Sequence, residues 1–193
     1  MGFFNDNKLL NDRQLKQLYD ETHFIEPFVS TKVKDGVISY GLSHSGYDIR
    51  IDNKFKVPVE KGIYDVKRNL EKRYTEITAT SGYYILPPNA YVLGVSVETF
   101  KMPPNIIGIA VSKSTYARIG VFCNISPLEP AWSGKLVIEI ANLSRHPAKI
   151  YCNEGIAQIL FFKIDQPQTT YSGKYQNQEG IKLATVEKIG GTV

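Results

Sequence analysis

Apolar and polar residues alternate from Tyr47 to Val59, with apolar side chains at most odd positions and polar or charged ones at most even positions. A period of two is typical of a strand with one buried face. The apolar series is interrupted at Asn53, where we expect a break in the strand. The even-numbered face is expected to meet water.

Short apolar runs separated by turn residues make up most of the second half of the chain. Prolines, glycines and asparagines punctuate the runs, as in Pro87-Pro88-Asn89 and Asn153-Glu154-Gly155. Many short strands with little helix favour an antiparallel barrel or sandwich. The predicted strands cover residues 83–86, 91–100, 106–111, 119–123, 136–141 and 156–164.

A short helix, an irregular segment and a tail complete the pattern. Asn11 is placed to cap a helix that ends near Thr22, with Gln14 placed to return the capping hydrogen bond. Residues 60–82 are charged and irregular, and we expect a surface excursion with a few helical residues around 66–73. We therefore expect one domain over residues 1–165 and a flexible tail over residues 166–193 that orders on a ligand.

Composition narrows the class of protein. The chain has 193 residues, 42% hydrophobic and 22% charged, which disfavours collagen-like, coiled-coil and disordered proteins. The net charge of +4 is not concentrated in a basic block, so we expect small anions rather than nucleic acid or membranes as partners. With no membrane-length apolar run and no signal-peptide pattern, the sequence predicts a cytoplasmic protein.

Cysteine and histidine usage gives little support for thiol or metal chemistry. Cys123 and Cys152 are expected to be buried free thiols, with a disulfide or a reactive thiol as alternatives. The three histidines are scattered, and the His-x-Glu and Pro-Cys-x-x-Cys signature of zinc-dependent nucleotide deaminases is absent. Because nucleophile-elbow, Walker and dinucleotide fingerprints are also absent, hydrolysis here would rest on a carboxylate and a water.

Two polar groupings lie within the apolar second half. Residues 112–118 combine hydroxyls with cations, and Ser112 or Ser114 is placed to cap a single helical turn, an arrangement that suits a phosphate chain. The alternative is a capped turn with solvated charges. Glu139 is an isolated carboxylate in an apolar strand, where its pKa is sensitive to its surroundings. The alternative is a rim carboxylate paired with a neighbouring lysine or arginine.

These segments resemble the core of the dCTP deaminases of the dUTPase-like superfamily. The resemblance rests on Lys113-Ser114-Thr115-Tyr116-Ala117-Arg118-Ile119-Gly120, Pro127-Leu128-Glu129-Pro130-Ala131-Trp132-Ser133-Gly134 and Val137-Ile138-Glu139-Ile140. Segments at 45–50, 147–158 and 173–180 follow in family order, so most of residues 8–183 are covered. The resemblance implies a mainly β subunit with short helices, a dUTPase-like (β-clip) barrel or sandwich, in a homotrimer with sites where subunits meet.

The resemblance also implies roles for individual residues. Glu139 matches the general base, while Ser114 and Arg118 match residues that hold the attacking water and the transition state. The substrate-binding positions that it implies are Lys113 and Thr115 for the triphosphate, Ile125, Ser126 and Pro127 for the base, Glu129 near the sugar, Val137 and Ile138 beside the general base, and Tyr171, Lys174 and Gln178 in a tail that closes over the triphosphate.

The implied reaction is zinc-independent hydrolysis of dCTP to dUTP and ammonia, with Mg²⁺ carried on the nucleotide phosphates and dTTP as a candidate inhibitor. Between Pro127 and Leu128 the chain is shorter than family members with a Thr-Ala-His-Arg-Ile-Asp or Thr-Ala-Gly-x-x-Asp segment. The fate of the triphosphate therefore stays open, and a bifunctional enzyme giving dUMP and diphosphate is an alternative. A dUTPase is disfavoured by the Gly173–Gly180 tail, and a non-catalytic nucleotide-sensing module by the intact Glu139.

Overall fold

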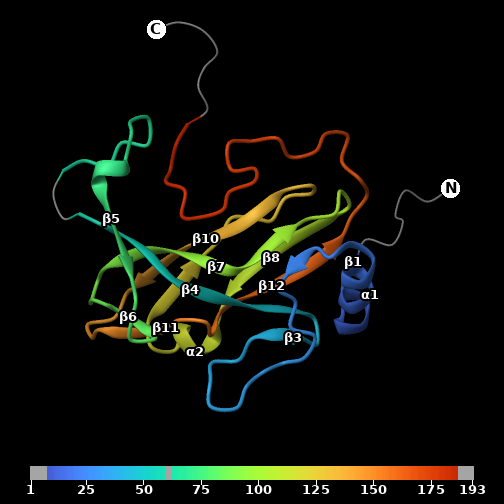
Figure 1. Ribbon diagram of the computed structural model, residues 1–193, viewed down its shortest axis with the longest axis horizontal. Coiled ribbons are helices and arrows are strands. Elements are labelled where there is room, and N and C mark those ends of the chain that lie inside the picture. The colour runs from blue at the N-terminus through green and yellow to red at the C-terminus, as the bar shows by residue number, and fades with distance from the viewer. Residues whose placement is uncertain (1–7, 60–61, 187–193) are drawn as a thin grey trace, which may run out of the picture.

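The computed structural model describes residues 8–59 and 62–186. Most strands belong to one ten-stranded sheet with the central order β1-β12-β4-β7-β10-β9, and β6 and β11 form a separate pair (Figure 1). The strands are β1 (Lys8–Leu9), β2 (Ile25–Glu26), β3 (Gly41–Ser43), β4 (Gly46–Pro58), β5 (Tyr74–Thr78), β6 (Tyr83–Leu86), β7 (Tyr91–Lys101), β8 (Ile106–Ser112), β9 (Val121–Asn124), β10 (Ser133–Asn142), β11 (Ala148–Tyr151) and β12 (Gly155–Lys163). The helices are α1 (Asp12–Thr22), the 3₁₀ turn η1 (Glu71–Arg73) and α2 (Ser114–Ala117).

The fold class predicted from the sequence is confirmed. All ladders between the described strands are antiparallel, and the helices are short. The six predicted strands correspond to β6, β7, β8, β9, β10 and β12. The sequence pattern missed the short strands β1, β2, β3 and β11, and also β5, which lies in the charged excursion and has no buried side chain.

The start of α1 follows the predicted capping box. Asn11 Oδ1 accepts a hydrogen bond from Gln14 N at 3.0 Å, and Gln14 Oε1 accepts one from Asn11 N at 3.2 Å. These bonds satisfy two of the free N–H groups at the helix start. Leu15, which is 1% exposed, then anchors the helix to the core.

Strand β4 contains a buried charge that its alternation does not predict. The expected break is present, because the register with β7 shifts between Ile51 and Phe55. The even-numbered face does not meet water at the start of the strand, where Asp48 is 1% exposed. Lys32 Nζ lies 3.2 Å from Asp48 Oδ2, and Lys113 also pairs with it. The prediction was wrong at Asp48 because lysines from neighbouring segments take the place of water.

Two apolar clusters hold the elements together. The main cluster is the hydrophobic core that the strands enclose, and it includes buried apolar residues of β4, β10 and β12. The second cluster joins the surface excursion, the sheet and the tail, and its buried members are Leu70, Leu93, Val95, Ile181 and Leu183, with Tyr74 and Val137 packed against them. The second cluster therefore fixes residues from three distant parts of the sequence beside one another.

The described part of the tail, residues 166–186, runs along the side of the molecule where β10 begins, away from α2 (Figure 1). Asn177 N donates to Ser133 O and Lys135 N donates to Gln178 O, both at 2.8 Å. Trp132 Nε1 donates to Tyr175 O at 2.9 Å. The tail thus lies directly beside β10, while its opening and closing over a triphosphate stays a prediction.

Candidate active site

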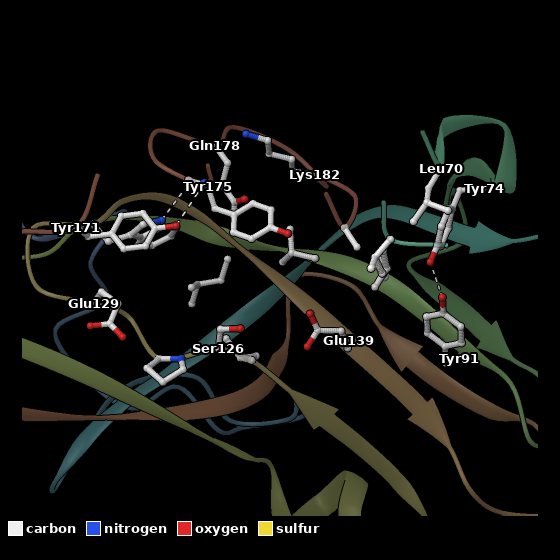
Figure 2. Close-up of a pocket in the computed structure, with 18 of the residues that line it drawn as sticks. Leu70, Tyr74, Tyr91, Ser126, Glu129, Glu139, Tyr171, Tyr175, Gln178 and Lys182 are labelled. Carbon is white, nitrogen blue, oxygen red and sulfur yellow. Dashed lines mark hydrogen bonds between the residues drawn. The ribbon is translucent and has the colours of Figure 1, made fainter. Parts of the chain in front are cut away.

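A cavity of about 810 Å³ lies between the sheet, the surface excursion and the tail (Figure 2). Tyr74 and Tyr91 form one end, and Glu129 and Tyr171 form the other, with Glu139 between them (Figure 2). Most of the residues that the sequence analysis assigned to substrate line this cavity: Ile125, Ser126, Pro127, Glu129, Val137, Glu139, Tyr171 and Gln178. Its size is within the range of pockets that bind small molecules.

Glu139 extends from β10 into the cavity and is half-buried. It lies opposite Asn124 of β9 on one side and Leu93 of β7 on the other. Asn124 Nδ2 donates a hydrogen bond to Glu139 Oε2 at 2.8 Å. Among the residues that the structure describes, no lysine or arginine forms an ion pair with Glu139, so the alternative of a rim ion pair within the chain is wrong.

Two opposing effects set the proton affinity of Glu139. Burial raises its pKa, while hydrogen bonds from Asn124 and from the backbone of Glu139 itself act in the opposite direction, and the net direction is upward. Burial, with a smaller contribution from the Glu139 charge, raises the pKa of the Cys123 thiol to about 12. A carboxylate with a raised pKa accepts a proton more readily, which is the property that a general base needs.

The segment from Ile125 to Pro127 presents unpaired backbone groups to the cavity. Leu128 fixes the segment from behind, since it exchanges backbone hydrogen bonds with Gly108 at 2.9 and 3.0 Å and is 1% exposed. Within the described residues, no backbone hydrogen bond engages Ile125 or Ser126. Their N–H and C=O groups are therefore available to recognise the edge of a bound ligand.

The α2 segment lies apart from the cavity. None of residues 113–118 is among the described residues that line it, and α2 is on the side of the molecule away from the tail (Figure 1). Tyr116 anchors the turn, because it is buried and its hydroxyl accepts a hydrogen bond from Tyr151 N at 2.9 Å. Ser114, Thr115 and Arg118 point outward and are exposed. A single chain therefore does not bring Ser114 and Arg118 to Glu139.

The predicted cap of the α2 turn is wrong. The residue at the cap position is Lys113, and no side chain caps the turn. Ser112 Oγ instead donates to Cys123 O at 2.7 Å and accepts from Cys123 N at 2.8 Å. Ser112 does not cap the turn because its hydroxyl is hydrogen-bonded to two backbone groups at the edge of β9.

Lys113 is held by a buried carboxylate. Its ammonium pairs with Asp48, and its side chain is 10% exposed. Burial lowers the pKa of Lys113, and Asp48 acts in the opposite direction. A contact of Lys113 with a triphosphate stays a prediction, as does that of Thr115.

The tail residues differ in their relation to the cavity. Gln178 Nε2 donates to Lys135 O at 2.7 Å, while its Oε1 is buried without a hydrogen-bond partner in the described part of the chain. Lys174 does not line the cavity, since its ammonium donates to Thr185 O and lies 5.0 Å from the centre of the Tyr175 ring. Gln178 therefore offers a free acceptor, whereas Lys174 already has partners.

Ile138 is the one expected substrate-binding residue of β10 whose side chain belongs to the main core. It is 0% exposed, and alternation along β10 directs its side chain away from Val137 and Glu139. Any contact of Ile138 with a ligand in the cavity would therefore use its backbone.

Several residues that line the cavity or lie beside it were not predicted from the sequence. Asn124 faces Glu139 only because β9 pairs with β10 in one register, which no local pattern reveals. Leu70 and Tyr74 line the cavity from the excursion, and the hydroxyl of Tyr74 is hydrogen-bonded to that of Tyr91. Leu70 and Tyr74 are apolar or aromatic residues within a charged segment, which was the available sign that they pack against other residues. Lys182 adds a cation from the tail.

The structure gives no support for a disulfide or a protein-made metal site. Cys123 and Cys152 are free thiols. Among residues 8–59 and 62–186, three or more His, Cys, Asp or Glu side chains do not gather in a group that could hold a metal ion. The described helices include none that is long and apolar enough to cross a membrane.

Comparisons with known proteins identify the family of the chain as a whole. A family model described as dCTP deaminase-like matches residues 9–164. A protein of Herpetosiphon aurantiacus named dCTP deaminase is 46% identical over 181 residues, which are 91% of this chain and 97% of that protein. One of Acidobacterium capsulatum with the same name is 47% identical over 165 residues, 82% of this chain and 89% of its own.

Among solved structures, the crystal structure of 2'-deoxycytidine 5'-triphosphate deaminase from Agrobacterium tumefaciens shares the fold. The two structures superimpose with a TM-score of 0.63 and 15% sequence identity. The superposition covers 82% of this chain and about half (49%) of the other chain. The match of the family model to most of the chain, together with relatives at 46–47% identity, identifies the family. The chain belongs to the dCTP deaminase-like family.

Proposed function

We propose that the protein hydrolyses dCTP to dUTP and ammonia. The observation that carries the proposal is Glu139, a half-buried carboxylate without an ion pair in the described chain, at the centre of a cavity of about 810 Å³. The relatives that match over most of this chain are named dCTP deaminases. A carboxylate and a water are sufficient for this hydrolysis if both are held in position.

Glu139 acts as the proton shuttle in this proposal. Its carboxylate takes a proton from a water that attacks C4 of cytosine, and the proton passes to N3. The second proton of the water then reaches the departing amino group through the same carboxylate, so that ammonia leaves and uracil remains. A pKa raised by burial suits both steps, because the group must accept a proton and release it again.

In this proposal, different walls of the cavity contact the base, the sugar and the triphosphate of the nucleotide. The free backbone groups of Ile125 and Ser126 would read the edge of the base, next to Pro127. Glu129 lies at the Tyr171 end of the cavity, where the sugar would be placed (Figure 2). The tail, with Gln178 and Lys174, would lie over the triphosphate.

A second copy of the chain completes the site in our proposal, as part of a homotrimer. Arg118, Ser114 and Thr115 are exposed on α2, where no ion pair or hydrogen bond within the described chain uses the Arg118 guanidinium. Exposed apolar side chains flank α2, namely Val111 at 51%, Ile119 at 52% and Phe122 at 47% exposure. Apolar side chains grouped on a surface are typical of an interface. The neighbouring copy would bring Arg118 and Ser114 to the water beside Glu139.

Magnesium enters the proposal as part of the substrate, bound to the nucleotide phosphates. The carboxylates that line the cavity among the described residues are Glu129 and Glu139. Mg²⁺ commonly keeps several waters and binds through substrate phosphates with one or two carboxylates at most. The residues present fit such a metal–nucleotide complex, in which Glu129 is the carboxylate nearest the sugar end.

The proposed product is dUTP. A second hydrolysis at the α-phosphate would need another water in line with the bond, and Glu129 is the available residue to orient it. Its side chain is one methylene longer than aspartate and follows the shortened segment at Pro127. Because positioned reactions lose about 100-fold in rate for a misplacement of about 1 Å, we propose a deaminase that leaves the triphosphate intact.

The test is incubation of the purified protein with dCTP and magnesium, followed by chromatography of the nucleotides and measurement of ammonia. The proposal predicts that dUTP and ammonia appear at equal rates, and that added dTTP slows the reaction as a competing nucleotide. Formation of dUMP and diphosphate at the rate of ammonia release would instead support the bifunctional alternative. Absence of ammonia from a folded, trimeric protein would contradict deamination.

A further inference from the structure

We propose that Asn124 is the positioning residue of the general base, fixing one oxygen of Glu139 so that the other faces the reacting water. The inference rests on the proposed role of Glu139. Asn124 was not singled out by its sequence context, and it does not line the cavity itself. Its one side-chain hydrogen bond within the described chain is the one to Glu139 Oε2, at 2.8 Å.

The register of two strands places the amide over the carboxylate. Asn124 and Glu139 are direct partners in the antiparallel pair of β9 and β10. Side chains of directly opposed residues lie on the same face of a sheet, about 5 Å apart at Cβ. The short asparagine side chain therefore reaches the carboxylate without leaving the strand, and only Oε2 is engaged. Glu139 Oε1 has no side-chain hydrogen-bond partner among the described residues, so it is free for a partner in the cavity.

The position of Asn124 is itself fixed by the segment that leads into α2. Ser112 Oγ satisfies both the N–H and the C=O of Cys123, on the edge of β9 that faces away from β10. Bonds at both edges hold β9 in one register. The chain that carries Ser114 and Arg118 is thereby connected to the residue that orients Glu139.

The amide also favours the charged form of the base. Burial raises the pKa of Glu139, and the Asn124 N–H opposes this by stabilising the carboxylate. Without the amide, only the backbone hydrogen bond of Glu139 itself opposes burial, so the pKa rises further. The base would then be protonated over more of the range near neutral pH, where it has to accept a proton.

The titratable groups around Glu139 come from the strands beside it and from the walls of the cavity. Leu93 lies on the β7 side, and the Cys123 thiol on the β9 side has a pKa of about 12. The other titratable groups that line the cavity are Tyr64, Tyr74, Tyr91, Tyr171 and Tyr175, with Glu129 and Lys182 as charged groups. Glu129 is the one other carboxylate among the described residues that line the cavity. Asn124 bonds to Glu139 and not to Glu129, so a substitution at Asn124 acts directly on the Glu139 carboxylate.

The experiment compares Asn124→Asp and Asn124→Leu with the unchanged protein. Both replacements are close to asparagine in size and remove the N–H donor. Asn69→Asp is the matched control, because Asn69 is exposed and uses its side-chain oxygen to accept from Glu71 N, which aspartate can also do. For each protein, kcat and kcat/KM for dCTP are measured across pH, and chromatography on a sizing column confirms assembly.

We expect the acidic limb of kcat/KM to move upward by about one pH unit or more in both Asn124 variants, since a protonated Glu139 cannot act as a base. The shift should be larger for aspartate, whose carboxylate would share a proton with Glu139. At neutral pH, kcat should fall about tenfold with little change in KM, while Asn69→Asp keeps the original profile. An unchanged acidic limb in both Asn124 variants would overturn the proposal, even if their rates were lower.

A second measurement reads the same pKa without activity. Carbon-13 NMR of protein labelled at the glutamate carboxyl carbons follows the titration of Glu139, with the resonance assigned by its loss in Glu139→Gln. The proposal predicts an upward shift of this titration in both Asn124 variants, whether or not dCTP is the substrate. A Glu139 titration that does not respond to Asn124 overturns the inference, whereas a lack of deamination by the unchanged protein overturns only the proposed function.

Discussion

The Glu139 cavity and the α2 segment carry the two groups of residues expected to act on substrate, and they differ in how completely one chain builds them. At the cavity, β7, β9, β10, the excursion and the tail surround a carboxylate that has a hydrogen-bond partner. At α2, Ser114, Thr115 and Arg118 project outward and are exposed. The first region is a formed pocket, whereas the second leaves its polar groups exposed, as our proposal of a second copy at α2 requires.

The two regions also differ in what fixes their side chains. Glu139 is positioned by Asn124, whereas α2 is fixed from below by Tyr116 and leaves its polar groups free. Exposed apolar residues near α2, such as Val111 and Phe122, would be covered if a second copy packed there. The contrast supports the proposal of a site that a single chain only half completes.

The largest effect is expected at the centre of the cavity. Glu139→Gln keeps the size of the side chain and its ability to accept from Asn124, but the amide cannot take a proton from water. We expect turnover of dCTP to fall by about 100-fold or more, with an unchanged far-ultraviolet circular dichroism spectrum. Ammonia release at a near-normal rate by this folded variant would remove Glu139 from the chemistry.

A smaller effect is expected from the side of the cavity formed by the tail. Ile181 and Leu183 are 9% and 6% exposed in the second cluster, so the double replacement Ile181→Ser with Leu183→Ser should detach this part of the tail. The main core is a separate cluster and should keep the fold intact. We expect KM for dCTP to rise about tenfold, because the apolar contacts that hold the tail over the nucleotide are lost.

Val186→Ser is the control for the tail variant. Val186 is 44% exposed in the same segment, so its replacement removes an apolar side chain without uncovering the cavity. Its KM should match that of the unchanged protein. Equal KM values for the double variant and this control would show that the tail does not contribute to nucleotide binding.

The smallest effect is expected from metal removal. Neither the cavity nor α2 offers a group of three or more metal-ligating side chains among the described residues. We predict that a zinc-selective chelator, added with magnesium in excess, leaves the rate of ammonia release unchanged. A loss of activity that added zinc restores would contradict the carboxylate-and-water mechanism.

The sequence predicted the elements that depend on local patterns. The capping box at Asn11, the strands marked by apolar runs and the isolated carboxylate at Glu139 follow from the spacing of residues along the chain. A strand or a helix cap is set by neighbours a few positions away, so its signal is readable in the sequence.

The sequence could not predict contacts that depend on pairing between distant segments. Asp48 was expected to face water, but lysines at 32 and 113 bury it. Ser112 or Ser114 was expected to cap the α2 turn, but neither does, and Ser112 bonds to the backbone of β9 instead. Asn124 reaches Glu139 only through the register of β9 and β10. In each case a long-range contact decides between local alternatives of similar energy.

The central claim, that one active site is shared between two copies of the chain, is tested most directly by mixing two inactive variants. Glu139→Gln retains an intact α2 segment, and Arg118→Ala retains an intact cavity. When the two are unfolded together in equal amounts and refolded, a trimer with shared sites contains about a quarter of sites with both residues intact. The account predicts that activity returns to about a quarter of the unmixed, unchanged protein. A mixture as inactive as either variant alone would contradict the shared site.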